Sequence, residues 1–237
     1  MNHKEMLYEG KAKKVYAMED SDLVMVEYKD DATAFNGLKK GTIEGKGVVN
    51  NLMSNYMFQY LEKKGVPTHF VEQIDDRHTI VKKVQIVPLE VIVRNRAAGS
   101  FCKRYGAKEG LVFAKPTFEF SYKNDDLGDP LLNEDHALAL NLATKEEIDQ
   151  IRHMALTVNK EMGELLLSVG IVLVDFKLEF GRLPDGKIVL ADEISPDTCR
   201  FWDAKTGEKL DKDRFRLDLG DEQQGYRELF KRLGLEK

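Results

Sequence analysis

The sequence predicts an α+β protein that begins with a mostly antiparallel lobe. Three observations support this class. Short apolar stretches with the alternation of β-strands open the chain between Leu7 and Tyr28. A helical pattern of apolar residues follows at Gly47–Lys64, and a second begins with the capping-box sequence Thr144–Glu147. Finally, Pro184–Gly186 lies between two apolar strands, which is a strong signal for an antiparallel hairpin.

The composition limits the classes of function. With 237 residues, the chain can form one large domain or two smaller ones. Its 42% hydrophobic and 32% charged residues are ordinary for a soluble globular protein. The net charge of −5, from 36 basic and 41 acidic residues, argues against nucleic acid as the main partner. A local basic pocket remains compatible with this charge.

The cysteines and the apolar runs indicate a soluble cytoplasmic protein. Cys102 and Cys199 form no CxxC pair, so neither a disulfide framework nor a zinc site is expected. No apolar run follows Lys4 and Glu5, which argues against a signal peptide. The most apolar stretch, Leu165–Val174, is too short to span a bilayer, so no membrane association is expected.

The N-terminal stretch Leu7–Tyr16 predicts two short strands around Gly10, which three lysines follow. Glycine lets the backbone approach a ligand closely, and lysines supply point charges for phosphate. The spacing alone favours a solvated basic hairpin tip over a phosphate site. Farther along, Gly41–Gly47 fails as a Walker motif because its spacing is short and Gly47 stands where Ser or Thr is needed.

The first lobe is expected to end between two predicted strands. The Lys83–Pro88 stretch breaks the strand pattern and predicts a connector. We therefore expect a first lobe with one helix at residues 1–86 and a larger α+β lobe at residues 87–237. The strands on either side of this boundary are expected at Thr68–Glu72, Thr79–Val84 and Leu89–Arg94.

The stretch from Glu90 to Ser100 is the first candidate for a ligand site. An apolar strand delivers Arg94 and Arg96 and then runs into small residues that open a short helix ending near Gly106. Two arginines, a Ser hydroxyl and helix N-terminal amides suit an anionic ligand such as phosphate. A basic surface turn explains the same pattern equally well.

The second candidate is the strand Leu173–Gly181. With strand periodicity, Val174 and the apolar residues after it pack on one face, while Asp175, Lys177 and Glu179 share the other. Charges on a sheet are tolerated only when other groups compensate them. A solvent-facing strand with its own ion pairs is the structural alternative.

The hairpin after this strand supplies a second carboxylate, but its register is open. A two-residue turn would place Glu179 opposite Asp192, whereas a three-residue loop with Gly186 as a bulge would place Glu179 opposite Ala191 and leave Glu193 on its face. In both registers two carboxylates share a face near a lysine. Opposed like charges destabilise a sheet unless a cation bridges them, and two carboxylates with a phosphate form a usual magnesium environment.

Together these stretches resemble one family, the SAICAR synthetases (phosphoribosylaminoimidazole-succinocarboxamide synthases) of purine biosynthesis. The resemblance spans nearly the whole chain and keeps the order of the family's motifs, with no departure at the motif positions. These motifs are Gly10–Lys13, Arg94–Ser100, Lys123–Asp125, Asp175–Gly181, Asp192–Asp197, Arg200–Asp203 and Asp211–Phe215.

The resemblance implies an ATP-grasp-like fold with a small antiparallel N-terminal lobe, a larger C-terminal lobe and the active site between them. It also implies a ligase that joins carboxyaminoimidazole ribonucleotide (CAIR) to L-aspartate while ATP gives ADP and phosphate. The implied route is an acyl phosphate, because a carboxylate is a poor electrophile until its oxygen becomes a good leaving group. Phosphoryl transfer needs positioning and charge neutralisation, which the charged residues could supply. The family commonly forms homodimers.

By resemblance, the nucleotide and metal side of the site is assigned first. Lys123 and Lys177 would steady the transferring phosphoryl group. Glu179 and Asp192 are the expected Mg²⁺ ligands, which favours the two-residue register or a compensating bulge. The expected ATP contacts are Lys11, Ala12, Lys13 and Lys123 at the phosphates, and the backbone around Lys82 and Val84 at the adenine.

The substrate side is implied in the same way. Arg94, Ser100 and Arg200 resemble a clamp for the ribonucleotide phosphate, and Asp175 is expected at the imidazole. The aspartate site is placed near Asp197 and Arg200. Two rival functions stay open: another ATP-dependent ligase or phosphotransferase acting on a sugar phosphate, and a nucleotide-sensing module without catalysis. A sensor would not need a lysine between two metal-facing acids.

Overall fold

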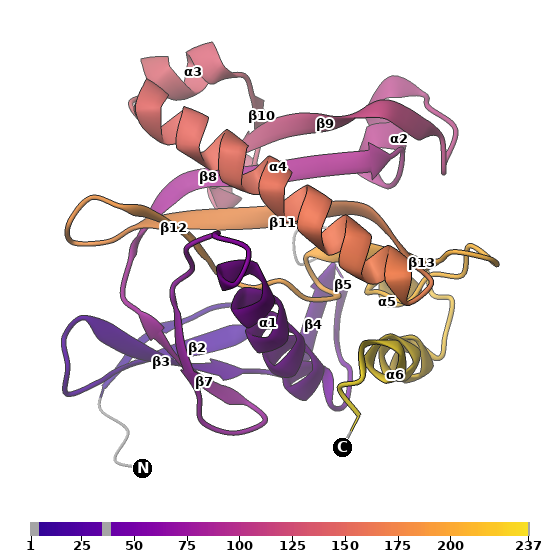
Figure 1. The fold of residues 1–237 in the computed structure, drawn as a ribbon, viewed down its shortest axis with the longest axis horizontal. Helices are drawn as coiled ribbons and strands as arrows, with labels where there is room; N and C mark the ends of the chain where they lie inside the picture. Colours follow the sequence, from indigo (N-terminus) through magenta and orange to yellow (C-terminus); the bar gives the residue numbers. More distant parts are fainter. Residues whose placement is uncertain (1–4, 35–38, 237) are drawn as a thin grey trace.

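The computed structural model describes residues 5–34 and 39–236, and it confirms an α+β fold built on antiparallel sheets (Figure 1). The first sheet has the strand order β1-β2-β3-β7-β6, in which all neighbours are antiparallel. Its apolar side chains, among them Val24, Val26 and Val81, form a small separate core. The strands are β1 (Met6–Glu9), β2 (Lys13–Ala17), β3 (Leu23–Tyr28), β6 (Phe70–Gln73) and β7 (His78–Lys82).

The second sheet has the order β10-β9-β8-β11-β12, and β13 also pairs with β11. β11 therefore lies at the centre, with β8 along one edge and β12 and β13 sharing the other. A separate antiparallel pair is formed by β4 and β5. The strands are β4 (Asp31–Ala34), β5 (Lys39–Thr42), β8 (Gln85–Arg96), β9 (Val112–Tyr122), β10 (Leu131–Leu132), β11 (Ile171–Arg182), β12 (Ile188–Ala191) and β13 (Cys199–Asp203).

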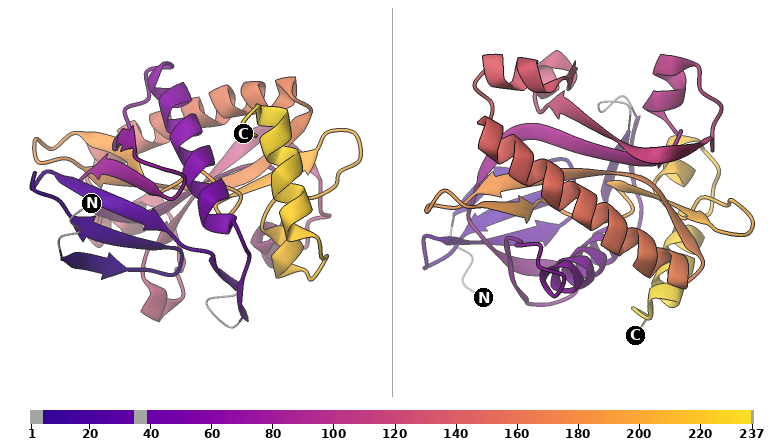
Figure 2. Two further views of the ribbon diagram at one scale, coloured as in Figure 1. Left: turned by 90° about the horizontal axis from the view of Figure 1, so that it is seen from below. Right: turned by 45° about the horizontal axis from the view of Figure 1, so that its top comes forward.

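The long helix α4 (Lys145–Ser168) crosses one face of the second sheet, as the views in Figures 1 and 2 show. Its predicted capping box is present: Thr144 accepts from the Glu147 backbone N–H, and the Glu147 side chain accepts from that of Thr144. Buried residues of α4 and of α1 (Lys46–Glu62) share the main core with the sheet. The other helices are α2 (Ser100–Tyr105), η1 (Asp125–Leu127), α3 (Glu134–Ala139), α5 (Asp213–Arg216) and α6 (Glu222–Leu233).

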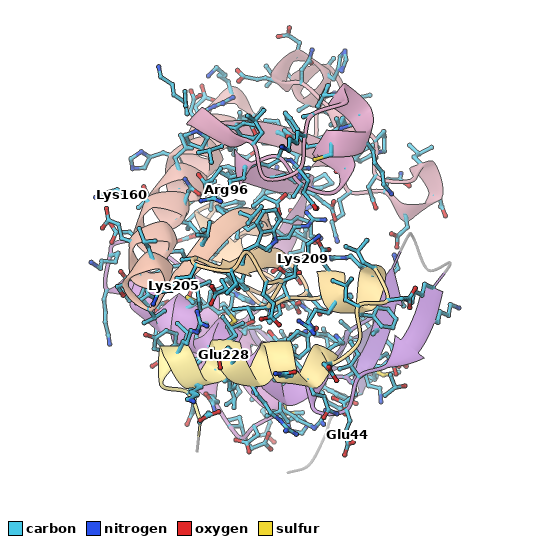
Figure 3. The ribbon with its side chains drawn as sticks, turned by 90° about the vertical axis from the view of Figure 1, so that its right-hand side faces the viewer. Glu44, Arg96, Lys160, Lys205, Lys209 and Glu228 are labelled. Atoms are coloured by element: carbon cyan, nitrogen blue, oxygen red, sulfur yellow. The ribbon has the colours of Figure 1, made fainter. Side chains whose placement is uncertain are left out.

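The C-terminal helix α6 closes the side of the molecule seen in Figure 3. There it lies below the segment that carries Lys205 and Lys209, and its Glu228 is paired with Arg232 one turn away. Leu229 on its buried face belongs to the main core. Within the described residues, no helix combines the length and the apolar character that crossing a bilayer requires.

The alternation predicted for β11 is confirmed for most of the strand. Phe176, Leu178 and Phe180 are buried in the main core. Val174 differs, because the pairing with β13 shifts between Leu173 and Asp175, and Val174 instead packs in a separate cluster with Ala98 and Trp202. The polar face beyond this irregularity is continuous and turns away from α4.

The connector expected at Lys83–Pro88 is wrong over most of its length, because β8 already begins at Gln85. Pro88 is tolerated inside the strand because β8 bulges there. Glu90 pairs with Glu179 and Ile86 with Gly181, so three residues of β8 lie opposite one residue of β11. The chain passes from the first sheet to the second at this point. The lobe boundary at residues 86 and 87 stays a prediction, and residues 1–4 and 35–38 of the first lobe lie outside the described residues.

The hairpin register is the three-residue alternative. Glu179 pairs with Ala191, and the Leu183 N–H donates to the Lys187 carbonyl across a loop in which Gly186 has a φ of 84°. β12 ends at Ala191, and Asp192 has a φ of 59°, a left-handed conformation that asparagine and aspartate tolerate better than most residues. This bend takes Asp192 out of the strand alternation and turns its side chain toward Lys13.

Candidate active site

Three lysines and two carboxylates meet beside the polar face of β11, and we call them the lysine–carboxylate cluster: Lys13, Lys123, Lys177, Glu179 and Asp192. One oxygen of Glu179 accepts from both Lys123 and Lys177, each at 2.9 Å. Lys13 is paired with Asp192. The cluster draws on four segments, since Lys13 begins β2, Lys123 follows β9, Lys177 and Glu179 lie on β11, and Asp192 follows β12.

The charges of this cluster stabilise one another. Burial alone would lower the pKa of Lys177, but Glu179, Glu90 and Asp192 reverse this effect and raise it above its usual range. Burial would raise the pKa of Asp192, yet Lys13 and Lys177 lower it to about 2. Lys177 is therefore protonated and Asp192 ionised at neutral pH. The carboxylates of Glu179 and Asp192 both stabilise the charge of Lys177.

Lys13 also contacts Glu193, at 3.1 Å. Glu193 is buried and accepts from the Ser195 hydroxyl at 2.8 Å, so its carboxylate is part of the wall behind the cluster. The sequence left open whether Asp192 or Glu193 joins Glu179. The structure brings Asp192 to the three lysines and holds Glu193 between Lys13 and Ser195.

The second centre is a small cavity of about 170 Å³ on the same face of β11. Arg94 donates to Asp175 at 2.6 Å and to the Ser100 hydroxyl at 3.2 Å, and Arg200 donates to both Asp175 oxygens at 3.0 Å. Asp175 is only 3% exposed. We call the cavity the arginine pocket and define it by the lining residues Arg94, Ser100, Asp175, Asp197, Arg200 and Arg216.

The predicted substrate residue Asp197 lies at one wall of the arginine pocket. Its Oδ2 accepts from Lys46 at 2.8 Å and from Lys212 at 3.0 Å. Burial would raise the pKa of Asp197, but the two lysines lower it well below its usual range. Among the described residues its Oδ1 has no hydrogen-bond partner, although the atom is buried. An ionised acceptor is therefore available at the pocket wall.

The remaining predicted nucleotide residues lie around the cluster without joining it directly. Lys11 reaches Asp125 of η1 at 2.8 Å, in an exposed ion pair. The Ala12 carbonyl accepts from the Lys29 N–H, and the Lys82 ammonium donates to the Thr68 carbonyl at 3.3 Å. Val84, between β7 and β8, is packed so closely on Gly181 that a Cβ there would lie 2.4 Å from its Cγ2.

Several charged residues that the sequence analysis did not single out complete both centres. Glu90 accepts from Lys177 at 2.6 Å, and Lys46 is fully buried against Asp197. Lys46 belongs to the glycine-rich stretch that fails as a Walker motif, and its neighbouring glycines were the only signal. Arg216 lines the arginine pocket, but its charge-rich segment gave no sign of this position.

The arrangement combines two chemical capacities on one strand. The lysine–carboxylate cluster presents cations for phosphate oxygens and carboxylates for a divalent cation. The arginine pocket presents planar donors of the kind that bind phosphate or carboxylate. Asp175 lies two residues before Lys177 on β11, so the two centres are neighbours on the sheet.

Comparison with known proteins identifies the family of this chain. The family model described as SAICAR synthetase matches residues 6–233. The chain is 62% identical over 236 residues to the phosphoribosylaminoimidazole-succinocarboxamide synthase of Lachnoclostridium phytofermentans, with 100% of both chains covered. It is 61% identical over 233 residues to the synthase of the same name from Caldanaerobacter subterraneus, covering 98% of this chain and 99% of the relative.

Solved structures give the same result. A crystal structure of the synthase from Ehrlichia chaffeensis has a TM-score of 0.96 at 45% identity and covers 98% of this chain and 100% of that one. A SAICAR synthetase in complex with ADP has a TM-score of 0.94 at 50% identity, with 97% and 98% covered. The chain therefore belongs to the SAICAR synthetase family.

Proposed function

We propose that this protein is an ATP-dependent ligase of purine biosynthesis that joins CAIR and L-aspartate to give SAICAR, ADP and phosphate. The observation that carries the proposal is the adjacency of two centres on β11, a lysine–carboxylate cluster and an arginine pocket. Family membership and the ADP complex of a relative support it. Another ligase or phosphotransferase with a sugar-phosphate substrate is the less favoured alternative.

The arginine pocket takes the ribonucleotide in this proposal. Arg94, Ser100 and Arg200 hold the 5′-phosphate, and Asp175 keeps both guanidinium groups in place while facing the imidazole. Asp197 and Arg200 contribute to the aspartate site. There Asp197 Oδ1, which has no hydrogen-bond partner in the part of the chain that the structure describes, is an acceptor for an ammonium or hydroxyl donor. Holding both reactants in one pocket lowers the entropic cost of their reaction.

The lysine–carboxylate cluster serves the nucleotide. Lys11, the Ala12 backbone and Lys13 contact the ATP phosphates, and the backbone around Lys82 and Val84 contacts the adenine. Lys123 and Lys177 neutralise charge on the γ-phosphoryl group during transfer, a process that depends on positioning and electrostatics more than on covalent help. Glu179 forms ion pairs with both ammonium groups and so keeps them close together.

The carboxylates of the cluster fit a Mg²⁺ ion. Among the described residues no group of three or more His, Cys, Asp or Glu side chains could hold a metal, so an all-protein cage is not expected. A magnesium site with one or two carboxylates and several phosphate oxygens needs only Glu179 and Asp192. Bound there, the ion would neutralise charge on the phosphates of ATP.

The chemistry proceeds in two balanced steps. An oxygen of the CAIR carboxylate attacks the γ-phosphorus, the bond to the β–γ bridging oxygen breaks, and ADP leaves with an acyl phosphate in place. The aspartate amine then attacks the acyl carbon, phosphate departs with the oxygen that came from the carboxylate, and the amine loses a proton. The positive charges of Lys123 and Lys177 stabilise the negative charge on the phosphoryl group in the first step and on the phosphate that departs in the second.

Several finer points belong to the same proposal. The two sheets form ATP-grasp-like lobes, divided near residues 86 and 87, with the site between them. The enzyme acts as a homodimer in the cytoplasm. Antiparallel sheets that meet at the lysine–carboxylate cluster support the first point, and the family resemblance supports the others.

The test measures ADP formation in four mixtures: CAIR with aspartate, each substrate alone, and neither. Rapid ADP formation is expected only when both substrates are present. ADP formation that ignores aspartate would refute the ligase, and formation with neither substrate would indicate a simple ATPase. If no mixture gives turnover although ATP binds, the protein is a nucleotide sensor.

A further inference from the structure

Asp213, at the start of α5, lies behind the arginine pocket and bonds two of its three arginines. Its Oδ2 accepts from Arg200 Nε at 2.7 Å, and its Oδ1 accepts from Arg216 Nη1 at 2.8 Å. Asp213 is 4% exposed and is not among the described residues that line the cavity. It can therefore influence a ligand in the pocket only through the two arginines.

Among the described residues, Arg200 and Arg216 have few other contacts that would orient their guanidinium groups. The second carboxylate partner of Arg200 is Asp175, which Arg94 shares, and the other contact of Arg216 is the Asp197 carbonyl at 3.1 Å. Neighbouring guanidinium groups repel each other, and this repulsion is strong away from bulk water. A single carboxylate that gives one oxygen to each guanidinium offsets the repulsion and fixes both planes.

Asp213 is itself held in a fixed place. Its backbone N–H donates to Asp211 Oδ1 at 2.7 Å, and the other oxygen of Asp211 accepts from the Phe201 N–H at 2.8 Å. Asp211 is fully buried. It therefore links the first residue of α5 to β13, directly beside Arg200. Asp213 thus has a fixed position relative to both arginines, although they come from separate elements.

Gly99 limits Arg200 from the opposite side. A Cβ on Gly99 would lie 2.3 Å from Arg200 Nη2, and its φ of 51° is in the region that favours glycine. Gly99 directly precedes Ser100, which bonds Arg94. The Arg200 guanidinium thus lies between Asp213 and the turn before α2. It has little freedom to reorient.

We propose that Asp213 is a positioning residue that sets Arg200 and Arg216 as a pair of donors for the phosphate group of the sugar-phosphate substrate. The inference rests on the proposed function and adds Arg216 to the residues that contact this phosphate. A tetrahedral phosphate dianion accepts from several planar donors at once, and it binds best where those donors are already oriented.

The test compares Asp213→Asn with Asp203→Asn in steady-state kinetics. Asp203 is a matched control because it lies on β13, is nearly buried and pairs with Arg232 at 2.6 Å, away from the arginine pocket. Asp213→Asn is expected to raise the KM for CAIR roughly 10-fold to 100-fold, the range for a lost charge-assisted hydrogen bond. The KM for ATP is expected to stay unchanged, and Asp203→Asn is expected to change neither constant.

Four further measurements separate positioning from general damage. The affinity for ribose 5-phosphate, measured by calorimetry, should fall in Asp213→Asn, whereas the affinity for ADP should not. Arg216→Gln, which changes a partly exposed residue, should raise the KM for CAIR as well. The double variant should cost less than the product of the two single effects, because both changes remove the same contact. Asp213→Glu should restore part of the affinity.

Two outcomes would overturn the inference. One is an unchanged affinity for ribose 5-phosphate in both Asp213→Asn and Arg216→Gln. The other is an equal loss of affinity for ribose 5-phosphate and ADP in Asp213→Asn, which would show a general structural role. If Asp213→Asn does not fold, Asp213→Glu takes its place, and an unchanged affinity for ribose 5-phosphate in both Asp213→Glu and Arg216→Gln would overturn the inference. Calorimetry needs no turnover, so a failure of the proposed ligase activity would be recognised separately.

Discussion

Asp175→Asn is expected to destabilise the protein strongly, because it removes the charge between the buried Arg94 and the half-buried Arg200. The Asp175 side chain is 4% exposed and lies 2.6 Å from Arg94 Nη1 and 3.0 Å from Arg200 Nη1. Breaking a buried ion pair from one side costs about 3–5 kcal/mol. Arg94 keeps Glu119 and Arg200 keeps Asp213, so we expect the lower end of the range, about 3 kcal/mol.

The assay is thermal and urea unfolding of the ligand-free protein. For a chain of this length, about 3 kcal/mol corresponds to a fall in Tm of roughly 6–12 °C. The control is Asp149→Asn, which breaks an exposed pair with Lys145 on α4 and is expected to leave Tm close to that of the parent. A loss below about 1 kcal/mol in Asp175→Asn would show that the two arginines do not depend on this carboxylate.

Three further predictions concern the cluster and the strand beside it. Glu179→Gln is expected to lower kcat by about 100-fold or more at saturating Mg²⁺, since it removes charge next to the phosphoryl group, and a near-normal rate would exclude Glu179 from the site. Asp192→Asn removes a group whose pKa falls from 3.8 to about 2 on folding, so it should cost about 2 kcal/mol of stability at pH 7. The difference in stability from the parent protein should shrink as the pH falls from about 4 toward 2. Urea unfolding at pH 7 and pH 3 measures this difference, and an identical value at both pH values would contradict the prediction. Gly181→Ala would bring a Cβ within 2.4 Å of Val84, so urea unfolding should show a loss of about 1–3 kcal/mol, and an unchanged stability would mean that Val84 can move.

Much of the fold could be predicted because its signals are local. The alternation along β11 predicted the polar face with Asp175, Lys177 and Glu179, and the capping box predicted the start of α4. The strand β3 (Leu23–Tyr28) lies within the stretch whose alternation predicted strands. Such features depend on residues close in the chain, so their periodicity is visible in the sequence.

The hairpin after β11 could not be predicted from local sequence patterns alone. The turn residues allowed two registers, and the position of Asp192 followed neither strand alternation, because a left-handed residue ends β12. Likewise, Pro88 suggested a connector, but a bulge accommodates it inside β8. Both cases depend on how neighbouring strands pair, which a single strand's pattern does not contain.

The arginine pocket was harder to predict in full, since its contacts join distant segments. Lys46 and Asp197 are 151 positions apart, yet their side chains meet at 2.8 Å. Arg216 and Asp213 lie in a charged segment of four helical residues with no periodicity to distinguish pocket residues from surface ones. The family resemblance implied a clamp of Arg94, Ser100 and Arg200, because the motifs that carry these residues are local.

If ATP activates the ribonucleotide carboxylate for attack by aspartate, a carboxylate oxygen must pass to the released phosphate, and isotope transfer measures this step. CAIR labelled with ¹⁸O at both carboxylate oxygens is converted with unlabelled ATP and aspartate, and the released phosphate is analysed by mass spectrometry. Each phosphate is expected to carry one ¹⁸O atom, because the carboxylate oxygen that attacks phosphorus leaves with it. Unlabelled phosphate, formed together with SAICAR, would exclude an acyl phosphate intermediate.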